Sequence, residues 1–185
     1  DLLYIADTYG VYKSGEGFSR TLAEGESNLI WGGSSYSDVQ AIKAFLNRES
    51  ASTVVAEYNT FATPTPSYVQ AQLYEVLGTR WTGWTGMYVN DLSKGGETPP
   101  WILDLYSTSW NYTGSGILLY NTDDEIVVLR SGIELGPGQM TFSYTERGED
   151  LLGLSGSTAY RLLFDITEPL AGTEVLATYT LDVNE

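Results

Sequence analysis

The stretch LLYIADTYG at residues 2–10, together with TVVAEYN at residues 53–59, decides the fold that we predict. Each stretch begins with an apolar run and continues into polar residues, which is typical of a buried strand that opens into a turn. Between them, Ser37 and Asp38 can cap a helix whose apolar residues share one face. The order strand, helix, strand indicates a parallel βαβ unit with a right-handed crossover.

The chain after residue 59 first repeats this pattern and then changes to strands. Ser67 can cap a second amphipathic helix, which Gly78 ends, and residues 101–110 form a further helical stretch. The later apolar segments are short and separated by turns, and we expect strands at residues 116–120, 125–129, 140–144, 160–166 and 174–181. We therefore predict one α/β domain over residues 1–185, a three-layer sandwich with a mainly parallel sheet that antiparallel strands extend in the C-terminal half.

The composition is that of a soluble, acidic, folded protein. The chain has 185 residues, of which 42% are hydrophobic, so it can bury a sizeable core without disulfides. Its net charge of −15, from 24 acidic and 9 basic residues, repels phosphate backbones and anionic lipid surfaces. We therefore expect no nucleic-acid partner, and the absence of a long apolar run predicts no membrane insertion.

The chain contains neither cysteine nor histidine. This excludes Cys-His and Ser-His-Asp catalysis within the chain and zinc sites built from nitrogen and sulfur ligands. Asp123, Asp124 and Glu125 lack the spacing of a calcium loop, so we expect no metal site. The glycine-rich turn at residues 31–35 matches neither a dinucleotide fingerprint nor a P-loop, and we expect no cofactor.

Polar side chains follow the two strands of the predicted βαβ unit. Asp7 and Tyr9 come after the first strand, and Glu57 and Asn59 come after the second. In open α/β sheets the carboxyl ends of the strands line the crevice where ligands bind. The carboxylates of Asp7 and Glu57 allow two interpretations. They either act as acid and base in the hydrolysis of a glycoside, or they only accept hydrogen bonds from backbone amides at the strand ends.

An aromatic segment at residues 80–84 adds Arg80, Trp81 and Trp84 to the candidate site. Indole rings with small polar neighbours suit stacking on sugar rings, and they equally suit a core or a protein interface. Trp81 and Trp84 lie three residues apart, so a regular strand points them to opposite faces and at least one belongs to the core. For Arg80 we expect an ion pair with Asp7, Glu57 or another nearby carboxylate.

Several of these segments resemble a group of uncharacterised bacterial proteins that are often membrane-anchored or exported. The resemblance lies in residues 6–12, 31–33, 56–62, 80–84 and 164–166 and spans most of the chain. It implies an extracytoplasmic, cell-envelope location. Chains of that group continue beyond the last residue here, so the resemblance also implies a fragment of a longer protein.

The front half is similar to the class I glutamine amidotransferase-like architecture, a sandwich of the flavodoxin-like kind. Enzymes of that architecture depend on a cysteine at a strand–helix elbow and on a partner histidine. This chain has neither residue, so the resemblance implies the architecture and not the activity.

Three hypotheses about function follow from the sequence. The first is a non-catalytic ligand-binding or scaffold domain of a bacterial cell-envelope protein, with a carbohydrate or cell-wall glycan as the expected ligand. The second is a carboxylate-dependent hydrolase that uses Asp7 and Glu57. The third is a structural domain whose Arg80–Trp84 segment contacts a protein partner. The expected ligand-binding residues are Asp7, Tyr9, Glu57, Asn59, Arg80, Trp81 and Trp84.

Overall fold

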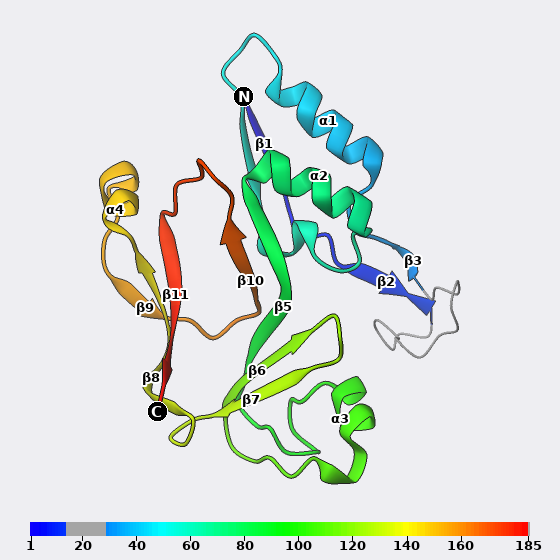
Figure 1. The fold of residues 1–185 in the computed structure, drawn as a ribbon, viewed down its shortest axis with the longest axis vertical. Helices are drawn as coiled ribbons and strands as arrows, with labels where there is room; N and C mark the ends of the chain where they lie inside the picture. The colour runs from blue at the N-terminus through cyan, green and yellow to red at the C-terminus, as the bar shows by residue number, and fades with distance from the viewer. Residues whose placement is uncertain (14–28, 185) are drawn as a thin grey trace. The chain divides into compact units, whose positions relative to one another are not determined.

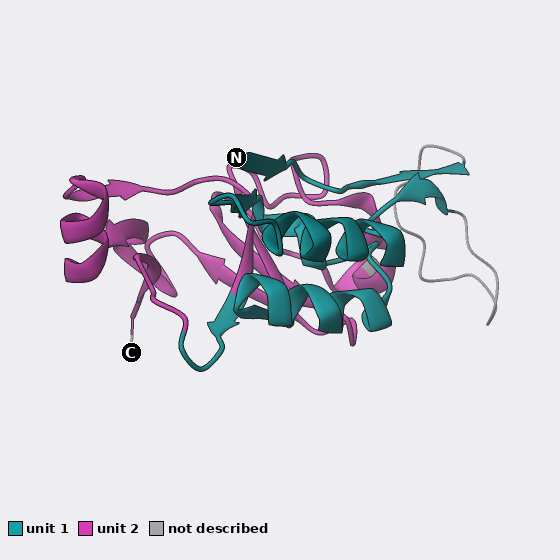
Figure 2. Ribbon diagram, turned by 90° about the horizontal axis from the view of Figure 1, so that it is seen from above, with its two compact units in different colours: residues 1–82, 167–172 teal, residues 83–166, 173–185 magenta. Residues whose placement is uncertain are grey.

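The computed structural model describes residues 1–13 and 29–184. The chain forms two compact units, which are coloured separately in Figure 2. Unit 1 comprises Asp1–Thr82 and Thr167–Gly172, and unit 2 comprises Gly83–Ile166 and Thr173–Glu185. The prediction of one domain over residues 1–185 stays a prediction.

Unit 1 contains the βαβ unit that the sequence predicts. Strands β1 (Leu2–Ile5) and β4 (Thr53–Ala56) pair in parallel, with Leu2 opposite Thr53 and Ile5 opposite Ala56. Helices α1 (Tyr36–Leu46) and α2 (Ser67–Leu77) run side by side next to this pair (Figure 1). The N-terminus of α1 is a capping box of Ser35 and Asp38, and Gly78 ends α2 in the left-handed conformation.

The core of unit 1 lies between the helices and one face of the β1–β4 pair. Alternate strand residues Leu3, Ile5 and Val54 pack inward against the helices. The buried residues of this cluster are Val39, Ile42, Phe61, Val69 and Leu73. Leu2, Tyr4 and Val55 occupy the opposite face of the two strands and are exposed.

A short antiparallel hairpin precedes α1 in unit 1. Its strands are β2 (Gly10–Tyr12) and β3 (Leu29–Gly32), with Gly10 opposite Gly32 and Val11 opposite Trp31. After β4 the chain forms the 3₁₀ turn η2 (Tyr58–Phe61), which leads toward α2. Both features lie at the carboxyl ends of β1 and β4.

Unit 2 consists mostly of antiparallel strands. Strands β5 (Thr79–Val89), β6 (Gly116–Asn121), β7 (Ile126–Arg130) and β10 (Phe164–Pro169) form a sheet of order β10–β5–β6–β7. Strand β5 begins in unit 1, and strand β10 ends in it. Helix α3 (Pro100–Tyr106) and the 3₁₀ turn η3 (Ser107–Ser109) follow β5, and a cluster around Leu92, Ile102 and Trp110 packs on Leu118 of β6.

A second antiparallel sheet completes unit 2. Its order is β11 (Ala177–Val183), β8 (Leu135–Tyr144) and β9 (Ser157–Ala159), with α4 (Glu146–Leu152) between β8 and β9 in the chain. The core of this part contains Ile117, Leu135, Met140 and Phe164.

The predicted three-layer sandwich with a mainly parallel sheet, of the amidotransferase or flavodoxin kind, is wrong. Among the described strand pairs whose register is defined, β1 and β4 pair in parallel and the others are antiparallel. The physical reason is that α2 leads into β5, an eleven-residue strand that pairs with β6 and not with β1 or β4. The parallel pair β1–β4 therefore has no third parallel strand among the described residues. Helices α1 and α2 cover one face of this pair.

No helix within residues 1–13 and 29–184 has the length and apolar character needed to span a membrane.

Candidate functional site

Three of the predicted site residues meet at the carboxyl ends of β1 and β4. Glu57 accepts a hydrogen bond from the Tyr4 hydroxyl and another from the backbone N–H of Asp7, at 2.7 Å. The Asn59 side-chain amide donates to Oδ1 of Asp7 at 2.9 Å. The residues therefore form one hydrogen-bonded chain, Tyr4–Glu57–Asp7–Asn59, which we call the carboxylate cluster.

The parallel register of the two strands brings this cluster together. Ile5 lies opposite Ala56, so Glu57 comes one residue after one paired position and Asp7 two residues after the other, and the Glu57 N–H donates to the Ile5 carbonyl at 3.0 Å. The turn η2 then returns the chain toward Asp7. Thr60 stabilises this turn, because its buried hydroxyl donates to the Glu57 carbonyl at 2.8 Å.

The hydrogen bonds of Glu57 stabilise its ionised form. The Tyr4 hydroxyl and, after it, the Asp7 N–H lower the pKa of Glu57 below its ordinary value, and the same contact raises the pKa of Tyr4. A general acid needs the opposite direction, a carboxyl group whose pKa is raised. The geometry of Glu57 therefore suits a fixed hydrogen-bond acceptor better than a proton donor.

Asp7 presents a second acceptor. Asn59 bonds to Oδ1, and among the described residues no hydrogen bond reaches Oδ2 of this half-buried side chain. An aspartate oriented through one oxygen can accept hydrogen bonds from a ligand through the other.

Two exposed aromatic rings contact each other in the chain segment that follows Asp7. Tyr9 and Trp31 have ring centroids 5.9 Å apart with planes tilted by 50°, and 56% and 59% of their surfaces are exposed. Tyr9 follows Asp7 by two residues, so their Cα atoms are at most about 7 Å apart. Trp31 was predicted to end a short strand before a glycine-rich turn and was not among the predicted site residues. The signal for it is an indole at the end of a short strand, next to two glycines.

Gly32 allows the close contact that sets Trp31 beside Tyr9. Its φ is 129°, and a Cβ atom there would lie 2.3 Å from the Tyr9 carbonyl oxygen. The following residue, Gly33, donates its N–H to the Thr8 carbonyl at 2.9 Å. The hairpin is thus tied to the same segment that carries Asp7.

Arg80 and Trp81 contact other parts of the described chain than the carboxylate cluster. The Arg80 guanidinium pairs with Glu168, a carboxylate other than Asp7 and Glu57. Trp81 packs against the core of unit 1, as expected for at least one of the two indoles. Trp84 belongs to unit 2, where it lies opposite Asn121 in the β5–β6 ladder.

In the part of the chain that the structure describes, His, Cys, Asp and Glu form no group of three or more that could hold a metal ion.

Comparisons of this chain with protein-family models, with curated proteins and with solved structures find no match.

Proposed function

We propose that unit 1 is a non-catalytic carbohydrate-binding module of a bacterial cell-envelope protein. The observation that supports this most is the exposed Tyr9–Trp31 pair, of which Tyr9 follows the oriented Asp7 by two residues in the chain. Binding sites for small ligands combine aromatic surface with a few fixed polar groups, and sugars offer an apolar ring face together with hydroxyl donors. The expected ligand is a neutral or amino-sugar glycan, such as a cell-wall glycan, because the net charge of −15 disfavours anionic chains.

The roles within the site follow from the hydrogen bonds. Oδ2 of Asp7 accepts from a sugar hydroxyl, while Asn59 holds the carboxylate in place through Oδ1. Glu57 fixes the backbone of Asp7 and the ring of Tyr4. Tyr9 and Trp31 offer ring faces for stacking.

Isothermal titration calorimetry with soluble neutral oligosaccharides and peptidoglycan glycan fragments tests this proposal. We expect saturable binding by the wild-type protein and a loss of at least about tenfold in affinity in Asp7→Asn, since a hydrogen bond to a charged acceptor contributes about 1.5–3 kcal/mol. Absence of heat with every glycan, from folded protein, contradicts the proposal.

The same glycans distinguish binding from the hydrolase hypothesis. Incubation of the wild-type protein and Glu57→Gln with each bound glycan, followed by analysis of reducing ends, measures turnover. The binding proposal predicts intact glycan with both proteins. Hydrolysis by the wild-type protein that disappears in Glu57→Gln would establish the enzyme instead.

A further inference from the structure

Strand β7 forms an edge of the four-stranded sheet, and its outer side has unpaired backbone groups. The Asn121 N–H donates to the Glu125 carbonyl, and the Ser131 N–H donates to the Ser115 carbonyl. In an antiparallel ladder, alternate residues point their N–H and C=O groups to the same neighbour. Residues 125, 127, 129 and 131 therefore face β6, and residues 126, 128 and 130 face away from it.

The chain itself pairs one of the three outward residues. The Arg130 N–H donates to the Glu134 carboxylate at 2.9 Å, and the Arg130 carbonyl accepts from the Ile133 N–H at 3.1 Å. Among the described residues no hydrogen bond reaches the N–H or C=O groups of Ile126 and Val128. Because buried backbone groups are almost always paired, we expect these groups to face solvent.

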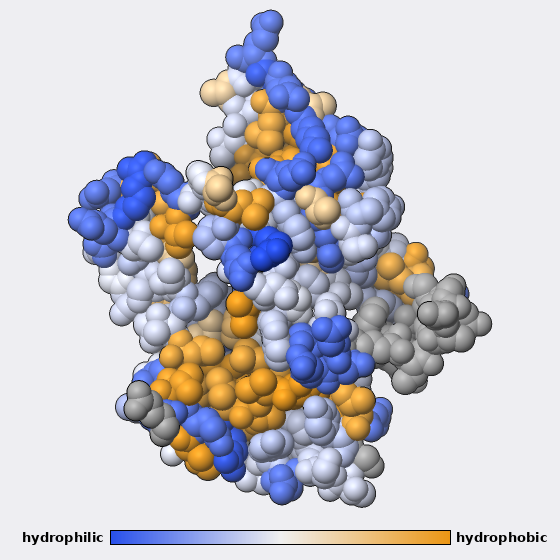
Figure 3. All heavy atoms as spheres, in the orientation of Figure 1, coloured by the Kyte–Doolittle hydropathy of each residue, from blue (hydrophilic) through white to orange (hydrophobic). Residues whose placement is uncertain are grey.

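The side chains next to this edge are apolar on both faces of the sheet. Ile126 and Val128 pack toward the cluster around Trp110, while Val127 lies with Leu119 and Leu129 on the opposite face. Exposure on that face increases toward the edge, from 0% at Ile117 to 40% at Val127. Figure 3 shows hydrophobic surface over β6 and β7.

The usual protections of an edge strand are missing from residues 126–129. Natural edge strands carry charges, proline or bulges that prevent pairing with another chain. Strand β10, at the other edge of the same sheet, has Glu168 and Pro169. In β7 the only charge is Arg130, which lies at its end.

We propose that β7 is a dimerisation edge, which pairs antiparallel with β7 of a second copy of this chain. A register that sets residue 126 of one copy opposite residue 128 of the other uses all the free N–H and C=O groups of Ile126 and Val128 in both copies. A second copy fits this edge because a twofold axis through residue 127 sets each free N–H of Ile126 and Val128 opposite a free C=O of the other copy.

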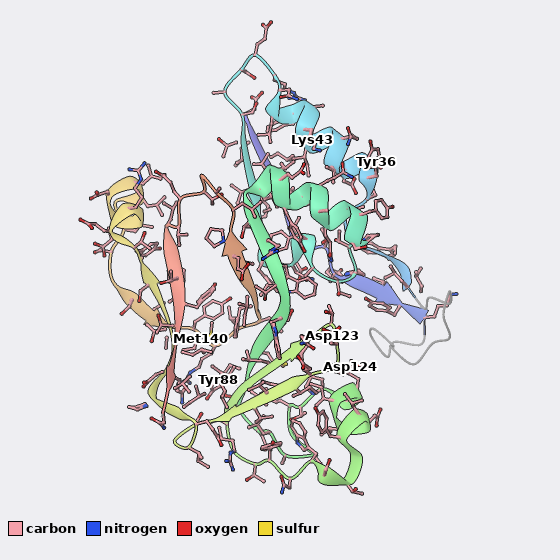
Figure 4. All side chains as sticks on the ribbon, in the orientation of Figure 1. Tyr36, Lys43, Tyr88, Asp123, Asp124 and Met140 are labelled. Carbon is pink, nitrogen blue, oxygen red and sulfur yellow. The ribbon has the colours of Figure 1, made fainter. Side chains whose placement is uncertain are left out.

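The same register makes the side chains complementary. Val127 lies on the twofold axis, directly opposite Val127 of the second copy, in a non-hydrogen-bonded pair where side chains approach most closely. Asp124, at the tip of the β6–β7 hairpin (Figure 4), lies opposite residue 130 of the second copy, where the Arg130 guanidinium is paired with Glu134 of its own chain.

Cross-linking through a single introduced cysteine tests the register, because the chain has no cysteine of its own. Cα atoms of a non-hydrogen-bonded pair are about 4.5 Å apart, a separation that a disulfide bridges. We expect V127C to form a disulfide-linked dimer under mild oxidation at least about tenfold faster than V175C. Val175 is the matched control, since it is a valine of unit 2 with 39% exposure against 40% for Val127. Equal rates for the two variants would overturn the proposal.

Sedimentation equilibrium supplies a second, independent test. The wild-type mass should rise toward twice the monomer mass with concentration, and V127K and V127E should each stay monomeric because like charges meet on the axis. Mixing V127K with V127E should restore association, which a variant that simply fails to fold cannot do. A wild-type mass that stays at the monomer value, or a mixture that stays monomeric, contradicts a dimer through β7.

Discussion

Glu57 joins three parts of unit 1 through its two carboxylate oxygens and its backbone. Tyr4 of β1 and the Asp7 N–H bond to its side chain, and Thr60 of η2 bonds to its carbonyl. The side chain is therefore a structural support for Asp7, and its ionised form is the one that supports it.

Substitution Glu57→Gln should lower the stability of unit 1 at neutral pH and have less effect in acid. The pKa of Glu57 in the folded protein lies below the ordinary value of 4.5. Its ionised form therefore stabilises the fold above that ordinary value, and this contribution is lost as the pH falls through the lowered pKa. Urea unfolding of the wild-type protein and Glu57→Gln at neutral and acidic pH measures the difference.

Glu75→Gln, at an exposed position of α2, is the control for this experiment. A gap between wild type and Glu57→Gln that stays constant across the pH range would show that the carboxylate charge has no role.

The site residues that the sequence could predict are those placed by local strand geometry. Asp7, Glu57 and Asn59 follow two short apolar runs, and parallel pairing of those runs was sufficient to bring them together. Arg80 could not be placed in this way, because its partner Glu168 lies 88 residues away in the chain. Trp31 was missed because exposure of an aromatic ring depends on what covers it, and the sequence pattern does not show that.

At the scale of elements, the β2–β3 hairpin is the feature that positions both aromatic rings. Gly32→Ala should separate Tyr9 from Trp31, because the added methyl group would overlap the Tyr9 carbonyl and φ is strongly positive. Near-ultraviolet circular dichroism reports the loss of ring contact, and glycan affinity should fall with it. Gly95→Ala is the matched control, since an added Cβ there meets nothing within 4 Å.

The N-terminal cap of α1 follows this hairpin directly. The Ser35 hydroxyl accepts from the Asp38 N–H, and the Asp38 carboxylate accepts from the Ser35 N–H at 2.7 Å. Ser35→Ala should lower the free energy of unfolding by about 0.5–2 kcal/mol, while Ser35→Asn should retain most of the wild-type value. Denaturant unfolding measures both, and equal losses in the two variants would show that the cap is not the cause.

The elements themselves were easier to predict than their assembly. The pair β1 and β4, the helices α1 and α2, and the β6–β7 hairpin lie where apolar periodicity and turn residues indicate them. The predicted third layer was wrong because strand pairing depends on distant partners. The segment after α2 is a strand, yet only its pairing with β6 shows that it extends an antiparallel sheet.

At the scale of the whole molecule, the net charge of −15 is the dominant electrostatic feature. Self-repulsion of this size destabilises a compact state, and salt screens it. Raising NaCl from about 0.01 M to about 1 M shortens the Debye length from about 30 Å to about 3 Å, so we expect the melting temperature to rise. Differential scanning calorimetry measures the shift, and a melting temperature that falls with salt would contradict the expectation.

Calorimetry on ring-deletion variants tests most directly the proposal that the exposed Tyr9–Trp31 pair binds sugar. Tyr68, which is 63% exposed on α2, provides a matched tyrosine control. With a glycan that binds the wild-type protein, we expect Tyr9→Ala and Trp31→Ala each to weaken binding at least about tenfold, since each removes about 1.5–3 kcal/mol of aromatic contact, while Tyr68→Ala binds as the wild type does. Undiminished binding by both Tyr9→Ala and Trp31→Ala, with folding intact, would contradict the account.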